Sequence, residues 1–210
     1  MAIILPSAEH IQYTLSQDLP GKKVQSKLSP VEASKYYEVR SDHKKAGVLL
    51  LISQGEKEPI VSFIIRTSNH PGDKHAGQIS FPGGKKEEYD ISMIACAQRE
   101  THEEIGVSPE QYTVLGTLSN LYVYVSNFLI TPVVGYTTSS LGFTPEESEV
   151  AGMIHHPLSD FYNYNNLKKK DLAIRQGIMK DVPYFDLKGQ VLWGATSMIM
   201  AEFISLFLDD

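Results

Sequence analysis

The pattern of apolar and polar residues predicts short strands interrupted by helices. Two apolar runs, Ala46–Ser53 and Pro59–Thr67, flank the turn-like segment Gln54–Glu58 and therefore predict a β-hairpin. Shorter runs rich in β-forming residues predict further strands at Gln78–Phe81, Tyr112–Leu118, Phe128–Tyr136 and Val191–Trp193.

Helical spacing occurs in three places. Residues 7–18 predict a helix with Ser7 as its N-cap, and residues 195–208 predict an apolar C-terminal helix. A central helix from Ile91 to Glu104 is followed by Gly106, which is placed to end it as a C-cap glycine. One stripe of this helix is expected to face the core: Ile91, Ile94, Ala95, Gln98, Thr101 and Ile105. This order of elements indicates an α/β or α+β fold with a mixed sheet.

The composition fits one globular domain with an extension. The chain has 210 residues, of which 42% are hydrophobic and 21% charged, so a sizeable core can form. We expect residues 1–44 to be an N-terminal extension, helical in part and packed on a domain of residues 45–210. The single cysteine, Cys96, excludes an intramolecular disulfide. Because neither a signal peptide nor a membrane-spanning run is recognised, we expect a cytoplasmic protein without a membrane partner.

The formal net charge of −6 narrows the choice of partners. It disfavours binding to DNA or long RNA, which requires clustered Lys and Arg, so no nucleic-acid partner is expected. A small anionic substrate remains compatible with this charge, because a bound metal can supply local positive charge. The sequence is compatible with a homodimer.

Three glutamates carry the strongest chemical signal. Glu100, Glu103 and Glu104 are spaced i, i+3 and i+4, so their side chains leave one face of the helix. Like charges at this spacing destabilise a helix, and the C-terminal end of the helix dipole also disfavours anions. A divalent cation would remove both penalties, and oxygen ligands favour Mg²⁺ or Mn²⁺ over zinc. The alternative for the three glutamates is a solvated acidic face of the helix. Arg99, four residues before Glu103, either forms a surface ion pair with Glu103 or acts as a clamp that orients the Glu103 carboxylate.

A glycine-containing segment precedes this helix. In Gly77–Lys85, the adjacent Gly83 and Gly84 allow close approach of the backbone to a ligand, and a carbonyl there can complete a metal's oxygen shell. A phosphate-binding P-loop is excluded because its G-x-x-x-x-G-K-[ST] pattern is absent. A double glycine alone is more often just a turn.

Together these residues resemble the Nudix box, G-x5-E-x7-R-E-U-x-E-E-x-G-U, where U is aliphatic. Its second half matches Arg99–Val107, with Thr101 at the first aliphatic position. Counted from Gly84, the first acidic position falls on Asp90, and eight residues separate it from Arg99. This one-residue expansion, with Asp in place of Glu, resembles the coenzyme A diphosphatase branch of the superfamily.

An upstream signature of that branch, approximately L-L-T-x-R-S-x3-R-x3-G-x3-F-P-G-G, is matched in part. Ile64–Ser68 matches its start loosely, whereas Gly77 and Phe81–Gly84 match well. The second Arg of the signature is Asp73 here, with Lys74 beside it as a potential substitute. Because Asp73 departs from the signature at this position, another nucleoside diphosphate derivative is retained as an alternative substrate.

The resemblance implies an α/β/α sandwich with a mixed sheet and a loop–helix–loop catalytic motif. It implies metal binding by Glu100, Glu103, Glu104 and the carbonyl of Gly83 or Gly84, with catalysis by the three glutamates and Arg99. It also implies Mg²⁺ or Mn²⁺ as cofactor. Substrate contacts are expected from Arg66, Lys74, His75 and Gly83.

Other residues have competing interpretations. Glu149 is a candidate extra ligand or base, with Glu146 and Glu147 as rivals, although ordinary surface charge is the simpler interpretation. His155 and His156 are adjacent and are expected to be structural instead of zinc ligands. Cys96 is expected to be a buried, inert thiol.

The leading functional prediction is metal-dependent hydrolysis of coenzyme A or its derivatives to 3′,5′-ADP and 4′-phosphopantetheine. The alternative within the same chemistry is hydrolysis of ADP-ribose or another nucleoside diphosphate derivative. A catalytically silent module that binds a nucleotide is disfavoured, because such modules usually lose the box carboxylates and all three are retained here.

Overall fold

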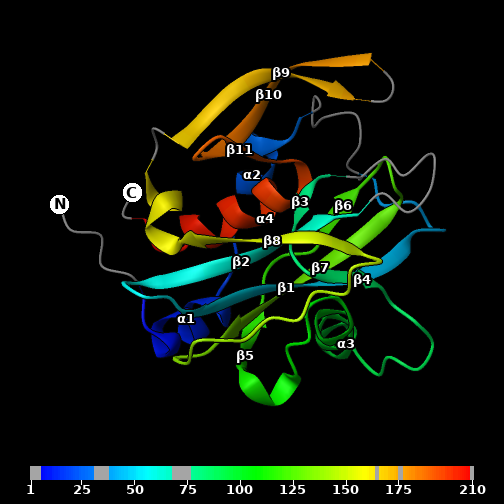
Figure 1. Cartoon of the computed structure of the whole chain (residues 1–210). Coiled ribbons are helices and arrows are strands. Elements are labelled where there is room, and N and C mark those ends of the chain that lie inside the picture. The colour runs from blue at the N-terminus through cyan, green and yellow to red at the C-terminus, as the bar shows by residue number, and fades with distance from the viewer. Residues whose placement is uncertain (1–5, 31–37, 68–76, 164–165, 175–176, 209–210) are drawn as a thin grey trace.

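The structure is a computed structural model, which describes residues 6–30, 38–67, 77–163, 166–174 and 177–208. Figure 1 shows helices on both sides of a central sheet, with a second, smaller sheet beside helix α4. The helices and 3₁₀ turns are α1 (Ala8–Leu15), α2 (Lys22–Gln25), η1 (Ser26–Leu28), α3 (Met93–Ile105), η3 (Pro109–Gln111), η4 (Leu158–Tyr162) and α4 (Gly194–Ser205). No helix in this described part of the chain has the length and apolar character needed to cross a membrane.

The central sheet is mixed, as the sequence predicts. Its strands are β1 (Lys44–Gln54), β2 (Pro59–Arg66), β3 (Ile79–Ser80), β4 (Gly83–Lys85), β5 (Thr113–Thr117), β6 (Leu121–Val123), β7 (Phe128–Tyr136) and β8 (Val150–Pro157). β1 pairs antiparallel with β2 through the predicted hairpin and parallel with β7. The two strands β1 and β2 then separate, and β4 pairs with β1 while β3 pairs with β2. The expected α/β class with a mixed sheet is therefore confirmed.

Two apolar cores lie on opposite faces of this sheet. Leu49 and Leu51 of β1 face α3, whereas Leu50 and Ile52 face α4, because successive strand residues point to opposite sides. The larger core includes the α4 residues Ile199, Met200 and Phe203, together with Ile11 and Leu15 of α1. This layering holds α3, which carries the glutamates, against one face of the sheet.

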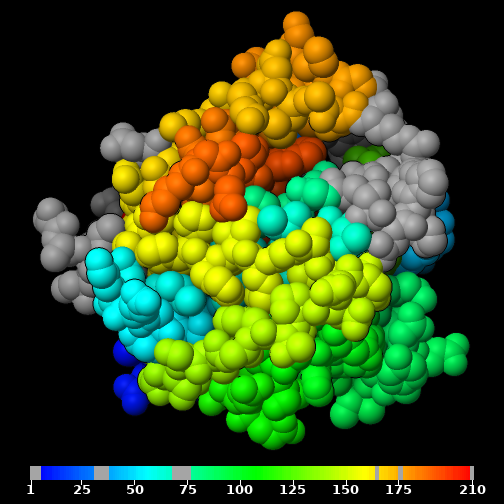
Figure 2. Space-filling view, viewed as in Figure 1, coloured from blue at the N-terminus to red at the C-terminus, as the bar shows by residue number. Residues whose placement is uncertain are grey.

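A three-stranded sheet follows η4 and consists of β9 (Leu167–Ile174), β10 (Gly177–Leu187) and β11 (Gln190–Trp193). Its inner residues Phe185, Leu187 and Leu192 join the core on the α4 side. The remaining surface of β9 carries consecutive exposed lysines. Figure 2 shows β8 at the surface of the near face, below this sheet.

Most element boundaries agree with the sequence, but two expectations were wrong. β4 forms at Gly83–Lys85, where the double glycine was interpreted as a turn. Ile91 lies before α3 and is 94% exposed, so it does not belong to the core stripe. Ser92 caps the helix, and the buried positions are Cys96, Ala97, Thr101, Glu104 and Ile105. The polar stripe of α3 thus includes a buried carboxyl that the hydrophobic pattern assigned to the surface.

The N-terminal segment is tied to the C-terminal helix. Glu202 of α4 has no exposed surface and accepts hydrogen bonds from Gly21 N at 3.2 Å, Gln25 Nε2 at 2.7 Å and Ser119 N at 3.3 Å. These bonds compensate for burying a carboxylate. The proposed boundary at residues 44 and 45 remains a prediction.

Candidate active site

Helix α3 places two carboxyl groups against the glycines of β4. Glu104 is 2% exposed, and its Oε2 accepts a hydrogen bond of 2.7 Å from the backbone N–H of Gly83. Burial raises the pKa of Glu104 to about 7, against the opposing effects of this hydrogen bond and of Arg66. A carboxyl that is buried at this cost is unusual in a purely structural helix end and is typical of a functional position.

Glu100 lies one turn earlier and faces Gly84. A Cβ atom built on Gly84 would overlap the Glu100 carboxyl group, so only glycine leaves room for it. Burial also raises the pKa of Glu100, although Arg99 opposes the shift. Gly84 therefore lets the Glu100 carboxyl approach the strand backbone, whereas a Cβ on Gly83 would instead meet Gly47 and Val48 of β1.

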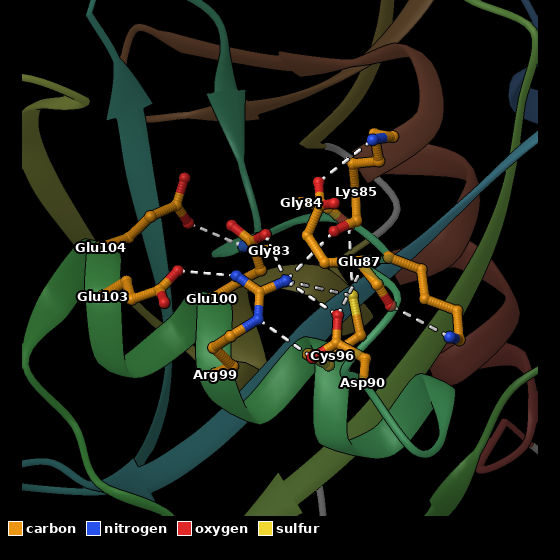
Figure 3. A network of polar contacts seen from close by, with 12 residues as sticks. Gly83, Gly84, Lys85, Glu87, Asp90, Cys96, Arg99, Glu100, Glu103 and Glu104 are labelled. Atoms are coloured by element: carbon orange, nitrogen blue, oxygen red, sulfur yellow. Dashed lines mark hydrogen bonds and ion pairs between the residues drawn. The ribbon is translucent and has the colours of Figure 1, made fainter.

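Arg99 organises the other acidic side chains (Figure 3). Its Nε and one terminal nitrogen each donate to Asp90 at 3.0 Å. The guanidinium also contacts Glu100 at 2.8 Å and Glu103 at 2.7 Å. The hydrogen bonds from Arg99 lower the pKa of Asp90 to about 2. Because the Arg99 side chain is only 18% exposed, the geometry agrees with a clamp that fixes these carboxylates and not with a loose surface pair.

The three glutamates of the box thus have different surroundings. Glu103 is 56% exposed and turns toward Arg99, whereas Glu104 turns toward Gly83 and lies 3.6 Å from the Arg66 guanidinium. The carbonyl of Gly84 accepts a weak hydrogen bond from the Cys96 thiol at 3.5 Å. Glu100 and Glu104 therefore lie against the backbone of β4, whereas Glu103 does not.

Glu149 also lies near this pair. Its negative charge raises the pKa of both Glu100 and Glu104, and its backbone carbonyl accepts a hydrogen bond from Thr67 N at 2.9 Å, beside the end of β2. Its rival Glu146 instead bonds the N–H and hydroxyl of Ser148. Of these acidic candidates, Glu149 raises the pKa of both Glu100 and Glu104.

Several sequence candidates lie elsewhere. Lys74 and His75, together with Asp73, are outside the described residues. His155 and His156 point to opposite faces of β8, since His155 bonds Ser62 at 2.9 Å and His156 lies between Asp160 and Gln190. Cys96 is buried, and burial raises its thiol pKa to about 11, as expected for an inert thiol.

Comparison with known proteins shows which family the chain belongs to. The NUDIX domain family matches residues 43–176, which is more than half of the chain. The chain belongs to the Nudix family. A Nudix hydrolase named NudL from Pectobacterium atrosepticum is 38% identical over 130 residues, a match that covers 61% of this chain and 66% of the relative. A NudL from Enterobacter sp. is 32% identical over 161 residues and covers 77% and 81%, respectively. The predicted membership of the Nudix hydrolases is thereby confirmed.

Similarity to solved structures is lower. The crystal structure of the M. smegmatis Nudix hydrolase RenU matches 56% of this chain and 73% of its own chain, with 20% sequence identity and a TM-score of 0.46. The family match includes residues 99–107, which resemble the second half of the Nudix box, and it also includes Asp90, which contacts Arg99.

Nudix hydrolases generally use divalent metal ions, and the donor set here suits one. Arg99 pairs with the carboxyl groups of Asp90, Glu100 and Glu103, and Arg66 pairs with that of Glu104. If these four carboxyl groups are ionised, they exceed the two guanidinium groups by two negative charges. A divalent cation would balance this charge and offset the burial that raises the pKa of Glu100 and Glu104. In the described part of the chain, no three potential ligands already surround one point.

Sequence reasoning missed two features of this site. The pairing of Arg66 with Glu104 joins β2 to α3 across 38 positions of the chain and has no local pattern. The burial of Glu104 was also missed, although Gly83, Gly84 and Gly47 could have indicated it. A Cβ on Gly47 would lie 2.7 Å from Met93 O, so these glycines let α3 approach the strands closely.

Proposed function

We propose that this protein hydrolyses the diphosphate bond of coenzyme A or its derivatives, giving 3′,5′-ADP and 4′-phosphopantetheine. The observation that carries the hydrolytic proposal is the placement of Glu100 and Glu104 against Gly83 and Gly84 beside a cationic Arg66. The choice of coenzyme A rests on the Phe81–Gly84 signature and on the expanded spacing from Asp90 to Arg99.

The carboxylates Glu100 and Glu104 would hold Mg²⁺ or Mn²⁺, with Glu103 as a further ligand or an orienting group and a Gly83 or Gly84 carbonyl as an additional donor. When bound, the cation supplies neutralisation of the diphosphate charge and a lowered pKa for the attacking water. The chain's own contribution is to place the ligands, since Arg99 fixes Glu100 and Glu103 while Gly83 N–H fixes Glu104.

The reaction adds one water across the P–O–P bridge. The water oxygen attacks one phosphorus, the bridging oxygen leaves with the other phosphoryl group, and two phosphomonoesters result. We infer that Glu100 or Glu104 orients the attacking water, because both carboxyl groups lie against the glycines where the cation would be held, and that a carboxylate of the site accepts the proton of that water. Glu149 is the third candidate for this role. Arg66, whose guanidinium lies 3.6 Å from Glu104, would contact the diphosphate oxygens.

A substrate panel tests this function. Coenzyme A, ADP-ribose and diadenosine polyphosphates are compared side by side in Mg²⁺ and in Mn²⁺, and phosphomonoester release is measured. We expect the highest kcat/KM with coenzyme A. Negligible turnover of coenzyme A with rapid turnover of ADP-ribose would favour the alternative that Asp73 keeps open, and absence of metal-dependent turnover with every substrate would favour a silent binding module.

A further inference from the structure

Four lysines meet where β1 and β4 pair. The segments Lys44–Gly47 and Gly83–Lys86 run antiparallel, with Gly47 opposite Gly84 and Ala46 opposite Lys85. The N–H of Lys86 donates to the carbonyl of Lys45 at 2.9 Å, which extends the ladder by one residue. The register therefore puts Lys45 directly opposite Lys86, in a protein whose net charge is −6.

This arrangement is unfavourable in the absence of an anion. Directly opposed residues on neighbouring strands have Cβ atoms about 5 Å apart, and like charges at such positions destabilise a sheet. The side chain of Lys45 is exposed and makes neither a hydrogen bond nor an ion pair with any described residue. Lys86 donates only to the backbone carbonyl of Glu87, at 3.2 Å, and the Glu87 carboxylate pairs with Lys85 instead, at 3.1 Å.

The lysine pair lies on the same face of the sheet as the box carboxyls. Side chains two residues apart on a strand share a face, so Lys86 shares the face of Gly84, which the Glu100 carboxyl contacts. Two residues of extended chain span about 7 Å, so Lys86 lies about that far along the strand from the glycine that the Glu100 carboxyl approaches. Lys44 and Lys85 project from the opposite face, where Lys44 Nζ lies 5.8 Å from the centre of the Phe128 ring.

We propose that Lys45 and Lys86 bind a phosphomonoester of the substrate that is separate from the scissile diphosphate. A phosphomonoester carries nearly two negative charges and three acceptor oxygens, so one such group can bridge two ammonium groups that otherwise repel each other. Lys44, on the opposite face, adds positive potential at the same end of β1, whereas the charge of Lys85 is balanced by Glu87. This inference rests on the proposed function and specifies its substrate class as diphosphates that carry an additional terminal phosphate.

The test compares coenzyme A with 3′-dephospho-coenzyme A, which differ only in that phosphomonoester. For the wild-type protein we expect kcat/KM to be about tenfold to a hundredfold higher with coenzyme A, the range of charged hydrogen bonds. In the double variant Lys45→Gln/Lys86→Gln this ratio should fall to within about twofold, with kcat/KM for the dephosphorylated substrate unchanged. The melting temperature should stay the same or rise, because the repulsion is removed.

A matched control removes the same two charges elsewhere. Lys169→Gln/Lys180→Gln changes exposed lysines of the β9–β10 hairpin, on the other side of the sheet from α3 (Figure 1), and should retain the wild-type ratio. A double variant at Lys45 and Lys86 that keeps the ratio, or loses activity equally on both substrates, would overturn the phosphate site. Equal wild-type rates on the two substrates would overturn this inference alone, whereas hydrolysis of neither would remove the proposed function and this site with it.

Discussion

Replacement of Asp90 by Asn tests whether the Arg99 clamp stabilises the fold. Asp90 is 5% exposed and makes two hydrogen bonds of 3.0 Å with Arg99, which lower its pKa from 3.8 to about 2. One pKa unit corresponds to about 1.4 kcal/mol, so the ionised carboxylate contributes about 2 kcal/mol at neutral pH. Asp90→Asn should lower the free energy of unfolding by this amount at pH 7.

The pH dependence of this loss follows from the sign of the shift. Since the folded pKa lies below the unfolded one, the stabilisation is complete above about pH 4 and is lost as the pH falls toward 2. The difference between wild type and Asp90→Asn should therefore be constant from pH 7 to pH 5 and shrink to about 1 kcal/mol at pH 3. Urea unfolding, followed by the fluorescence of the single tryptophan, Trp193, measures both quantities.

Asp42 provides the control for burial. It forms the same two-pronged contact with Arg40, at 3.0 and 2.8 Å, but its side chain is 61% exposed. Asp42→Asn should leave stability nearly unchanged, since exposed ion pairs contribute little. Equal destabilisation by the Asp42 and Asp90 variants would refute the reasoning, as would a difference at Asp90 that does not depend on pH.

Three further outcomes are expected. Gly84→Ala should lower kcat about a hundredfold, because the added Cβ displaces the Glu100 carboxyl. Gly142→Ala is the control and should leave kcat unchanged, since a Cβ at Gly142 would have no atom within 4 Å. Equal rates for the two variants would contradict the packing argument. Glu202→Ala should reduce the free energy of unfolding in urea by about 2 to 4 kcal/mol, because buried donors such as Gln25 Nε2 lose their acceptor, and a loss below about 1 kcal/mol would show that they find other partners. Chelation by EDTA should abolish turnover, and added Mg²⁺ or Mn²⁺ should restore it; activity that survives exhaustive chelation would exclude the metal-dependent account.

The sequence predicted helix α3 well because its signals are local. The terminal Gly106 adopts the left-handed conformation with φ of 72°, and Glu100, Glu103 and Glu104 lie on neighbouring turns as their spacing requires. The hairpin of β1 and β2 was also predictable, since continuous apolar runs flank a polar turn. These features depend on residues within one turn or one hairpin of each other.

The remaining features depend on contacts between distant segments. β4 looks like a turn in the sequence, yet it becomes a strand because Gly83 and Gly84 fit between β1 and α3. β9 has no apolar alternation, and its pairing with β10 supplies the backbone hydrogen bonds instead. The burial of Glu104 follows from that same close packing, so no pattern within α3 alone distinguishes it from the exposed Glu103.

The central claim is that the buried carboxyl of Glu104 is part of a metal-dependent diphosphate hydrolase site. Turnover of coenzyme A in Mg²⁺ by Glu104→Gln, compared with wild type at equal folded fraction, tests it most directly, with the exposed Glu110→Gln as the charge-matched control. We predict that Glu104→Gln loses about a hundredfold or more in kcat while its unfolding transition remains cooperative, and that Glu110→Gln matches wild type. Near-normal turnover by a folded Glu104→Gln variant would contradict the account.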